Sequence, residues 1–416
     1  MFNIALDTLG CKLNQAETEA MGREFAQAGY HLVSPQDNWD IYILNTCTVT
    51  HVADRKARYQ MRIARRHNPS GFICLTGCYA ENGGNEISCP DANLILDNRQ
   101  KTDIVNNIIR LFPLENSASA LYEKGRTRSF IKIQDGCDNF CTYCIVPFVR
   151  RYKNCRGVDD IISEINLRQA EGYQEIVLTG TEIGEYTSSG FNLAGLIEAI
   201  LERTRIPRLR LSSLQPNEIT LPLLALWKNR RLCNHFHMAL QSGSDRILGL
   251  MNRPYSLTDY TRTLEAIRRQ IPDVAVTTDM IVGFPGETDE DFACSLKYVE
   301  QAGFARVHPF PYSERPGTMA SQLTDKVDPV VIKTRLSGMM LAAKNASLEY
   351  RHQSRDLEKE VLWENKMKDG LWFGYTPDYI RVYGKFTEKP TNTISRVKLA
   401  KVYADGVLSS EIASQV

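Results

Sequence analysis

Short apolar segments alternate with helical segments along most of this 416-residue chain, and that alternation constrains its fold more than any other feature. One series of alternating segments covers residues 1–112, and a second begins near Arg128 and continues to about Ala320. Strands that alternate with helices form parallel sheets, whose ligands bind beyond the carboxyl ends of the strands. The sequence therefore predicts an α/β protein with its chemistry at strand ends.

The pattern changes along the chain in a way that predicts three domains and one linker. Residues 1–112 are predicted to form an N-terminal parallel-sheet domain, and residues 113–126 a linker. Repeated strand–helix units in residues 127–350 predict a partial (β/α) barrel. Residues 351–416 alternate apolar and polar residues around glycine-containing turns, which predicts a small antiparallel β-barrel.

Charge and the absence of apolar spans limit the function classes. The chain has 50 basic and 49 acidic residues, so a nucleic-acid partner would have to be bound by local patches. Its first residues lack the features of a signal peptide, and no apolar run is long enough to span a membrane. We therefore expect a cytoplasmic protein. In that reducing compartment its 11 cysteines indicate metal or redox chemistry more than disulfides.

Three cysteines, Cys137, Cys141 and Cys144, stand close together after a segment that is predicted to be a strand, and we name them the loop trio. Grouped thiolates select iron–sulfur clusters, zinc or copper(I). A structural zinc site needs four ligands, and no fourth Cys or His stands at finger spacing nearby. Three thiolates on a cubane cluster would leave one iron open to a substrate. Buried or disulfide-bonded cysteines are the competing interpretation.

A second set of cysteines, Cys11, Cys47 and Cys78, follows three predicted strands of the first series, and we name it the strand-end trio. Carboxyl ends of parallel strands meet at one edge of a sheet, so the three thiols are expected to form a second cluster site. Their spacing alone would be a weak signal. Cys74 lies inside a predicted strand and is interpreted as a core residue, and Cys89 is assigned no role.

The sequence around these cysteines resembles that of the radical S-adenosylmethionine methylthiotransferases. The segments "TLGCKLNQAET", "NTCTVT" and "LTGCYAE" resemble the cysteine motifs of the N-terminal domain of that family. Three later segments resemble further motifs of the family: "LQSGSDRILGLMNRPY", "DMIVGFPGETDEDF" and "PYSERPGT". In addition, an aromatic residue precedes the last cysteine of the loop trio, as it does in the family. The order of domains is also similar, ending in a TRAM-type β domain. Within the family, "GCKLNQAE", "NTCTVT" and "GYTPDYIRV" most resemble the branch that acts on threonylcarbamoyladenosine beside the tRNA anticodon.

This resemblance implies two [4Fe–4S] clusters and S-adenosylmethionine as radical source and methyl donor. The loop trio would hold the cluster that cleaves S-adenosylmethionine, and the resulting 5′-deoxyadenosyl radical would activate carbon 2 of the modified adenine. The strand-end trio would hold an auxiliary cluster that carries the inserted sulfur. An external electron donor of the flavodoxin or ferredoxin type is implied as well. Strand-end position and motif match give four candidates for cofactor contacts: Glu182, Ser213, Gln241 and Asp279.

One segment departs from the family pattern. The family usually has an Arg-Gly start and an Arg-Ser-Arg end after the cluster loop, whereas residues 150–156 are Arg-Arg-Tyr-Lys-Asn-Cys-Arg here. The family's contacts are therefore not carried over to this segment. Cys155 is an additional thiol near the loop trio, and we interpret it as a replacement for serine.

A cationic helix is predicted after Cys47, and its arginines share one face: Arg55, Arg58, Arg62, Arg65 and Arg66. A solvated face is the competing interpretation, but charges of one sign beside a cluster site favour a phosphate backbone. Aromatic and basic residues of the C-terminal domain suit single-stranded or looped RNA. The expected partner is the anticodon stem-loop of tRNA.

Other functions are compatible with the sequence. The chain could be an RNA-binding protein whose clusters are structural or sense redox state, without radical chemistry. It could also be a methylthiotransferase that acts on another tRNA adenosine or on a ribosomal protein. His235 and His237 could form a zinc site with Cys233, although barrel-lining or core histidines are preferred.

Overall fold

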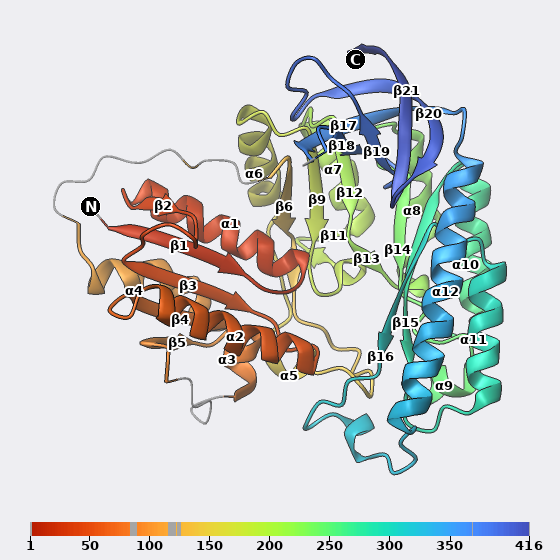
Figure 1. Ribbon diagram of the computed structural model, residues 1–416, viewed down its shortest axis with the longest axis horizontal. Coiled ribbons are helices and arrows are strands. Elements are labelled where there is room, and N and C mark those ends of the chain that lie inside the picture. The colour runs from red at the N-terminus through yellow and green to blue at the C-terminus, as the bar shows by residue number, and fades with distance from the viewer. Residues whose placement is uncertain (1, 84–89, 115–121, 123–125, 368, 416) are drawn as a thin grey trace. The chain divides into compact units, whose positions relative to one another are not determined.

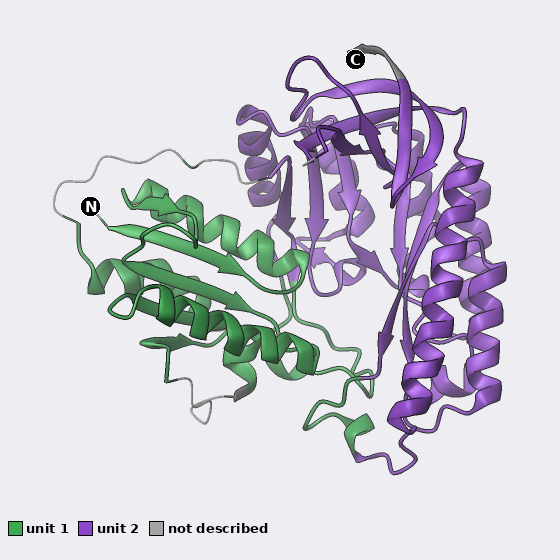
Figure 2. Ribbon diagram, viewed as in Figure 1, with its two compact units in different colours: residues 1–125, 135–154, 313–321 green, residues 126–134, 155–312, 322–416 purple. Residues whose placement is uncertain are grey.

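The computed structural model describes residues 2–83, 90–114, 122, 126–367 and 369–415, the last five of them by their backbone alone. Cys89 and most of the predicted linker lie outside the described residues. The chain forms two compact units (Figure 2). Unit 1 contains residues 1–125, 135–154 and 313–321, and unit 2 contains residues 126–134, 155–312 and 322–416. The division into three consecutive domains stays a prediction.

Unit 1 is built on a parallel sheet with the strand order β2-β1-β3-β4-β5 (Figure 1). Its apolar side chains form a core on each face: α2 and α3 pack on one face, and α1 and α4 pack on the other. The elements are β1 (Asn3–Thr8), α1 (Lys12–Gln27), β2 (His31–Val33), β3 (Ile41–Thr46), α2 (His51–His67), β4 (Phe72–Gly77), α3 (Cys78–Gly83), β5 (Leu94–Leu96), η2 (Gln100–Asp103) and α4 (Ile104–Leu111).

Two segments from later in the chain complete unit 1. The first, residues 135–154, carries the loop trio and the short helix α5 (Val146–Val149). The second, residues 313–321, inserts Arg315, whose buried guanidinium lies 2.8 Å from Asp54 and donates to Thr48 at 2.8 Å. The Ala320 amide also donates to the Thr142 carbonyl oxygen in the cysteine loop at 2.8 Å. Both cysteine trios therefore belong to the same compact unit.

Unit 2 contains a partial barrel of parallel strands. Its two sheets have the orders β12-β9-β6 and β13-β14-β15-β16, and Ser212 alone separates β12 from β13. This architecture confirms the predicted α/β barrel. The strands are β6 (Arg128–Lys132), β9 (Glu175–Thr179), β12 (Arg208–Leu211), β13 (Ser213–Leu214), β14 (His235–Met238), β15 (Ala275–Val282) and β16 (Arg306–Pro311).

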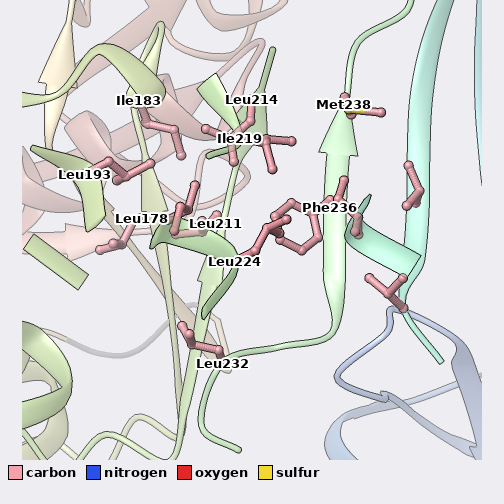
Figure 3. Close-up of a cluster of buried hydrophobic side chains, with 14 of the residues drawn as sticks. Leu178, Ile183, Leu193, Leu211, Leu214, Ile219, Leu224, Leu232, Phe236 and Met238 are labelled. Atoms are coloured by element: carbon pink, nitrogen blue, oxygen red, sulfur yellow. The ribbon is translucent and has the colours of Figure 1, made fainter. Parts of the chain in front are cut away.

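Helices between these strands bury their apolar faces against the sheet. Figure 3 shows part of this core, where Leu178 and Leu211 of neighbouring strands lie near Leu193 and Leu224 of the helices. Several helices begin at a side-chain cap, as Ser256 and Thr288 do for α10 and α11. The helices are α6 (Val158–Ala170), α7 (Leu193–Arg203), α8 (Leu221–Ala225), α9 (Asp245–Leu250), α10 (Leu257–Gln270), α11 (Asp289–Gln301) and α12 (Pro329–Gln353). Short elements are β7 (Gln134–Asp135), β8 (Asn154–Cys155), η3 (Ile183–Glu185), β10 (Thr187–Ser188), β11 (Phe191–Asn192), η4 (Pro216–Glu218), η5 (Leu226–Lys228) and η6 (Met319–Gln322).

The C-terminal residues close into a five-stranded barrel with the order β17-β18-β19-β21-β20. Trp363 is fully buried in its core, and the indole N–H donates to Ser395 Oγ at 2.8 Å. The predicted β-barrel is thus confirmed, with one difference: β19 and β21 run parallel, and the other pairs are antiparallel. The strands are β17 (Glu358–Lys366), β18 (Trp372–Tyr375), β19 (Arg381–Gly384), β20 (Ile394–Tyr403) and β21 (Gly406–Gln415).

This small barrel docks on residues that begin the strands of the partial barrel. Arg208 and Arg210 of β12 donate to the backbone oxygens of Tyr375 and Pro377 at 3.0 and 2.7 Å. Arg210 also pairs with Glu175, the first residue of β9, at 2.7 Å, and both side chains are fully buried. The docking surface is therefore at the amino ends of the strands, which leaves their carboxyl ends to other contacts. In the part of the chain that the structure describes, no helix is long and apolar enough to cross a bilayer.

Candidate functional site

The strand-end trio lies at the carboxyl ends of three neighbouring strands, β1, β3 and β4. Gly10 and Gly77, which precede Cys11 and Cys78, have positive φ angles of 116° and 97°. A Cβ added to Gly10 would lie 2.5 Å from the Cβ of Cys47, and one added to Gly77 would overlap the backbone at the end of β3. Glycine is therefore required at both positions for the three cysteine-bearing turns to approach one another.

The three cysteines follow adjoining strands of one sheet, and the pKa values of the Cys11 and Cys47 thiols respond to the neighbouring cysteines in the way that this proximity implies. Burial raises the pKa of Cys47 to about 12, and the neighbouring Cys78 and Cys11 contribute to the rise. Cys11 is exposed at the surface, yet desolvation by the neighbouring protein atoms raises the pKa of its thiol, while Arg150 opposes that rise. Three adjacent thiolates repel one another unless positive charge neutralises them. This donor set suits a metal cluster better than three free thiols.

Two asparagines contact the strand-end trio. Asn14 accepts from the Cys11 thiol at 3.8 Å, and its own amide donates to the Leu9 carbonyl oxygen at 2.9 Å. Asn98 lies with its side-chain amide 3.8 Å from the Cys78 sulfur. A donor such as the Asn98 amide can hydrogen-bond to a ligating sulfur and so fix the orientation of a metal ligand.

The loop trio is held in a turn of unit 1. The Cys144 amide donates to the Cys141 carbonyl oxygen at 2.9 Å, and Phe140 has a positive φ of 42°. Gly136 also has a positive φ, of 79°, and a Cβ there would lie 2.7 Å from the backbone of Lys153. The chain therefore folds back tightly on the segment that follows the cysteines.

The four candidates for cofactor contacts lie within or just after strands of the partial barrel. Glu182 is buried beyond β9, Ser213 is exposed at the start of β13, and Asp279 is half-buried in β15. Gln241 has a φ of 72°, and its backbone N–H donates to the carbonyl oxygen of Asp279 at 2.9 Å. A non-glycine residue in this region is strained, and such strain occurs most often at functional sites.

A carboxylate that no sequence motif marks lies beside Glu182. Gln215 donates to Glu182 at 2.6 Å, and its backbone N–H donates to Glu218 at 2.8 Å. Burial raises the pKa of Glu218 to about 8, and the nearby carboxylates of Glu182 and Glu185 contribute to the rise. Glu218 is therefore protonated near neutral pH. A raised pKa beside a candidate site is itself a functional signal.

We expect Glu218→Gln to change the pH dependence of stability. The usual pKa of a glutamate is about 4.3, so between that value and about 8 the folded protein binds a proton that the unfolded chain has lost. The free energy of unfolding should then fall as pH rises, by up to about 1.4 kcal/mol per pH unit. Glutamine has no titrating proton, so the stability of the variant does not fall in this way. The variant should therefore become more stable relative to the wild type as pH rises from about 4.3 to about 8. Chemical denaturation at several pH values measures it.

The matched control is Glu202→Gln, which changes an exposed glutamate of α7. It should follow the wild type at every pH. Parallel pH profiles for Glu218→Gln and the wild type would show that Glu218 is ionised in the folded protein.

Comparisons with known proteins decide the family. The model of the "Radical SAM superfamily" matches residues 131–299, and that of the "Uncharacterized protein family UPF0004" matches residues 3–96. The threonylcarbamoyladenosine tRNA methylthiotransferase of Bacillus subtilis is 35% identical, covering 96% of this chain and 94% of that protein. The enzyme of that name from Thermotoga maritima is also 35% identical, covering 98% and 97%. This chain belongs to the radical SAM tRNA methylthiotransferases. A tRNA-2-methylthio-N(6)-dimethylallyladenosine synthase of Syntrophus aciditrophicus is 34% identical, covering 90% and 84%.

Solved structures support the radical SAM fold. A radical S-adenosylmethionine methyltransferase from Kitasatospora setae matches with a TM-score of 0.58 at 12% identity, covering 83% of this chain and 89% of that one. Radical SAM methylthiotransferases use [4Fe–4S] clusters and S-adenosylmethionine. The resemblance seen in the sequence is thus confirmed, as are the enzyme class and the use of [4Fe–4S] chemistry with S-adenosylmethionine, whereas the presence of two clusters stays a prediction.

The arginines on the cationic face of α2 differ in how exposed they are and in what they contact. Arg55, Arg62 and Arg66 are exposed. Arg58 is exposed too, and it donates to the hydroxyl of Tyr79 at 3.3 Å. Arg65 is engaged within the unit, where it donates to the backbone oxygens of Pro69, Gly71 and Asp91 at 2.7 to 3.0 Å. Most of the predicted RNA-binding face is therefore open to a phosphate backbone, and Arg65 also braces the end of its own helix.

The atypical segment of this methylthiotransferase makes definite contacts. Arg150 is buried in unit 1, where it pairs with Glu17 and Asp135 at 3.0 and 2.7 Å. Arg156, in unit 2, lies 2.6 Å from Glu164 and donates to the Lys132 carbonyl oxygen at 2.9 Å.

Cys155 packs against the core of the partial barrel, and its sulfur accepts from the Thr187 amide at 3.4 Å. A serine hydroxyl could accept the same hydrogen bond. The interpretation as a serine replacement therefore has a physical basis.

The barrel histidines hydrogen-bond to neighbouring strands. His235 is buried and lies 3.1 Å from Thr277 Oγ1. His237 Nε2 lies 3.2 Å from Asp279 Oδ2, and His237, Asp279 and His308 bring one ligand-type atom each within 4.8 Å of the others. His235 is thus a core histidine, whereas His237 joins a polar group that includes a candidate cofactor contact.

Proposed function

We propose that this enzyme inserts a methylthio group at carbon 2 of threonylcarbamoyladenosine next to the anticodon of tRNA. The observation that carries the proposal is the convergence of Cys11, Cys47 and Cys78 at one edge of the sheet in unit 1, which also contains the loop trio. One trio suits radical generation and the other suits the delivery of sulfur. Four relatives of 34 to 35% identity carry the name of this reaction and support the choice of nucleoside.

Each trio has a separate role in this proposal. When bound, the two clusters supply the reductive cleavage of S-adenosylmethionine and the sulfur atom that is inserted. Cys137, Cys141 and Cys144 would hold the loop cluster, which would bind and cleave S-adenosylmethionine. The strand-end trio would hold the auxiliary cluster, and the side-chain amide of Asn98, which lies 3.8 Å from the Cys78 sulfur, would donate to that thiolate. An electron donor of the flavodoxin or ferredoxin type supplies the electron.

The barrel face would hold S-adenosylmethionine through Glu182, Ser213, Gln241 and Asp279. Glu182 is an acceptor suited to an amino group, and its position is fixed by Gln215 and by Gln134, which accepts from the Glu182 backbone N–H at 2.8 Å. The protonated carboxyl of Glu218 would reduce the negative charge beside Glu182. Charge balance of this kind lets one carboxylate stay ionised in a buried site.

We propose that α2 binds the phosphate backbone of the anticodon stem-loop. The exposed arginines lie with Val52, Tyr59 and Ile63, whose side chains are 47, 58 and 39% exposed, so the face combines charge with apolar surface. Such a face suits phosphates and splayed loop bases together. We also propose a cytoplasmic location, in keeping with a tRNA substrate.

Replacing both Arg55 and Arg62 by glutamine should weaken tRNA binding at every tRNA sequence. Each phosphate contact that is lost lowers the slope of log affinity against log salt by about one unit, so the double variant should lose about two. Binding measured across a salt series checks this. Arg262→Gln, which removes an exposed arginine of α10, is the control and should keep the wild-type slope. A double variant with an unchanged slope would contradict the contact.

The proposed substrate is tested with anaerobically reconstituted enzyme, S-adenosylmethionine and a strong reductant. Two matched tRNAs are offered, one with threonylcarbamoyladenosine and one with dimethylallyladenosine. Mass spectrometry of the nucleosides should detect the methylthio product with the first tRNA. Product with the second tRNA alone would assign the enzyme to the dimethylallyladenosine branch. Modification of a ribosomal protein would make that protein the substrate, and binding of tRNA without cleavage of S-adenosylmethionine would indicate an RNA-binding protein without radical chemistry.

A further inference from the structure

Arg150 lies beyond the loop trio in sequence, and its side chain is buried with 4% exposure. Its guanidinium donates to both carboxylate oxygens of Glu17 at 3.0 and 3.2 Å, to Asn14 Oδ1 at 2.8 Å and to Asp135 Oδ1 at 2.7 Å. A guanidinium stays protonated in proteins. Its position and its charge are therefore both fixed.

The same segment touches the strand-end trio. Asn14, which accepts from Arg150, also accepts from the Cys11 thiol at 3.8 Å. Val149 packs against Cys78, and its carbonyl oxygen accepts from the Asn98 amide at 2.6 Å. Residues 149 and 150 are thus held against two of the three thiols of the strand-end trio, one through apolar contact and one through a shared amide.

The group around Arg150 holds two cations and two carboxylates, so its net charge is zero, and replacing any one of them by a neutral residue changes that charge by one unit. Glu17 accepts from Lys101 at 2.8 Å as well as from Arg150, and the side chains of all three are at most 8% exposed. The negative charge of Glu17 is therefore shared between two cations. Asp135, which is 21% exposed, is the other carboxylate of the group. Asp135 precedes the loop trio and Arg150 follows it, so their ion pair closes the base of the cysteine loop.

We propose that Arg150 is a positioning residue that places a permanent positive charge beside the auxiliary cluster and raises its reduction potential. The inference rests on the proposed function, because it requires a cluster on the strand-end trio. Hydrogen bonds and charge around the ligands are among the factors that set the potential of such clusters. A nearby cation favours the reduced cluster, which carries one more negative charge. The same ion pairs also join the cysteine loop to this site.

The potential of the auxiliary cluster is measured alone in the full-length Cys137→Ala/Cys141→Ala/Cys144→Ala variant, by a redox titration followed by electron paramagnetic resonance. Adding Arg150→Gln should lower the ratio of reduced to oxidised cluster at a fixed potential about tenfold, which is a shift of about 59 mV for a one-electron couple. Arg150→Lys keeps the charge and should restore the curve of the parent. Arg151→Gln is the control, since Arg151 is exposed and donates to the Phe148 carbonyl oxygen.

A second variant tests the sign of the effect. Asp135→Asn removes a carboxylate and keeps Arg150, so the potential should move in the positive direction. If Arg150→Gln fails to hold its cluster, the shift measured in Asp135→Asn alone tests whether charge at this position sets the reduction potential. Superimposed titration curves for the parent and Arg150→Gln, or a negative shift in Asp135→Asn, would overturn the inference. A parent variant without iron would instead overturn the proposed auxiliary cluster, and iron analysis distinguishes the two failures.

Discussion

Replacing the strand-end trio by alanine is expected to abolish the methylthio product and to leave the cleavage of S-adenosylmethionine measurable. The loop trio, which is proposed to generate the radical, stays intact in this variant, while the ligands of the sulfur carrier are gone. Replacing the loop trio should abolish both cleavage and product. With two cubane clusters the wild type should hold about eight irons per chain, and each triple variant should hold about four.

Cys294→Ala is the control for these variants, because Cys294 is an exposed thiol on α11. It should keep the iron content and the product of the wild type. Full methylthio activity in Cys11→Ala would rule out the auxiliary cluster. About four irons in the wild type and none in the loop-trio variant would mean that Cys11, Cys47 and Cys78 hold no cluster. The enzyme would then lack its proposed sulfur carrier.

The alternation of apolar and helical segments predicts β1, β3 and β4 because each is an apolar run with polar neighbours. The three residues of β2 (His31–Val33) at the edge of the sheet form too short a run to give a pattern. The convergence of the strand-end trio depends on β1, β3 and β4 being neighbours. The order of the strands along the chain, together with the rule that parallel strands end at the same edge of a sheet, is enough to predict that the three cysteines converge.

Contacts between distant parts of the chain are not predictable from local patterns. Arg315 donates to Thr48 across 267 positions of sequence, and this contact helps to bring residues 313–321 into unit 1. Helical periodicity places Arg65 on the same face as Arg58, but only the fold shows that Arg65 turns to nearby backbone oxygens. The raised pKa of Glu218 likewise comes from burial and from Glu182, and neither leaves a signal in sequence spacing.

Replacing Glu175 by glutamine is expected to destabilise unit 2 by about 3–5 kcal/mol, because it leaves buried arginines without their counter-charge. Burial alone would raise the pKa of Glu175, but Arg210 and Arg128 outweigh it and hold the pKa below its usual value, so the carboxylate is ionised at neutral pH. Arg210 Nε lies 2.7 Å from Glu175, and the same guanidinium lies 3.8 Å from the ring centre of Tyr379. Chemical denaturation measures the loss, and limited proteolysis should show that the C-terminal barrel loosens first.

Two further variants test whether the loss of stability comes from the buried charge of Glu175. Asp159→Asn breaks an ion pair of similar length, 2.7 Å, whose side chains are 49 and 84% exposed, and it should cost about 1 kcal/mol or less. Replacing Glu175 and Arg210 together by apolar residues of similar volume should recover part of the stability, because the closest pair of buried charges is then removed, although buried Arg208, 3.8 Å from Glu175, still loses a counter-charge. A loss for Glu175→Gln as small as that for Asp159→Asn would show that water reaches the pair. The docking of the C-terminal barrel would then depend on apolar packing and backbone hydrogen bonds instead of on this buried charge.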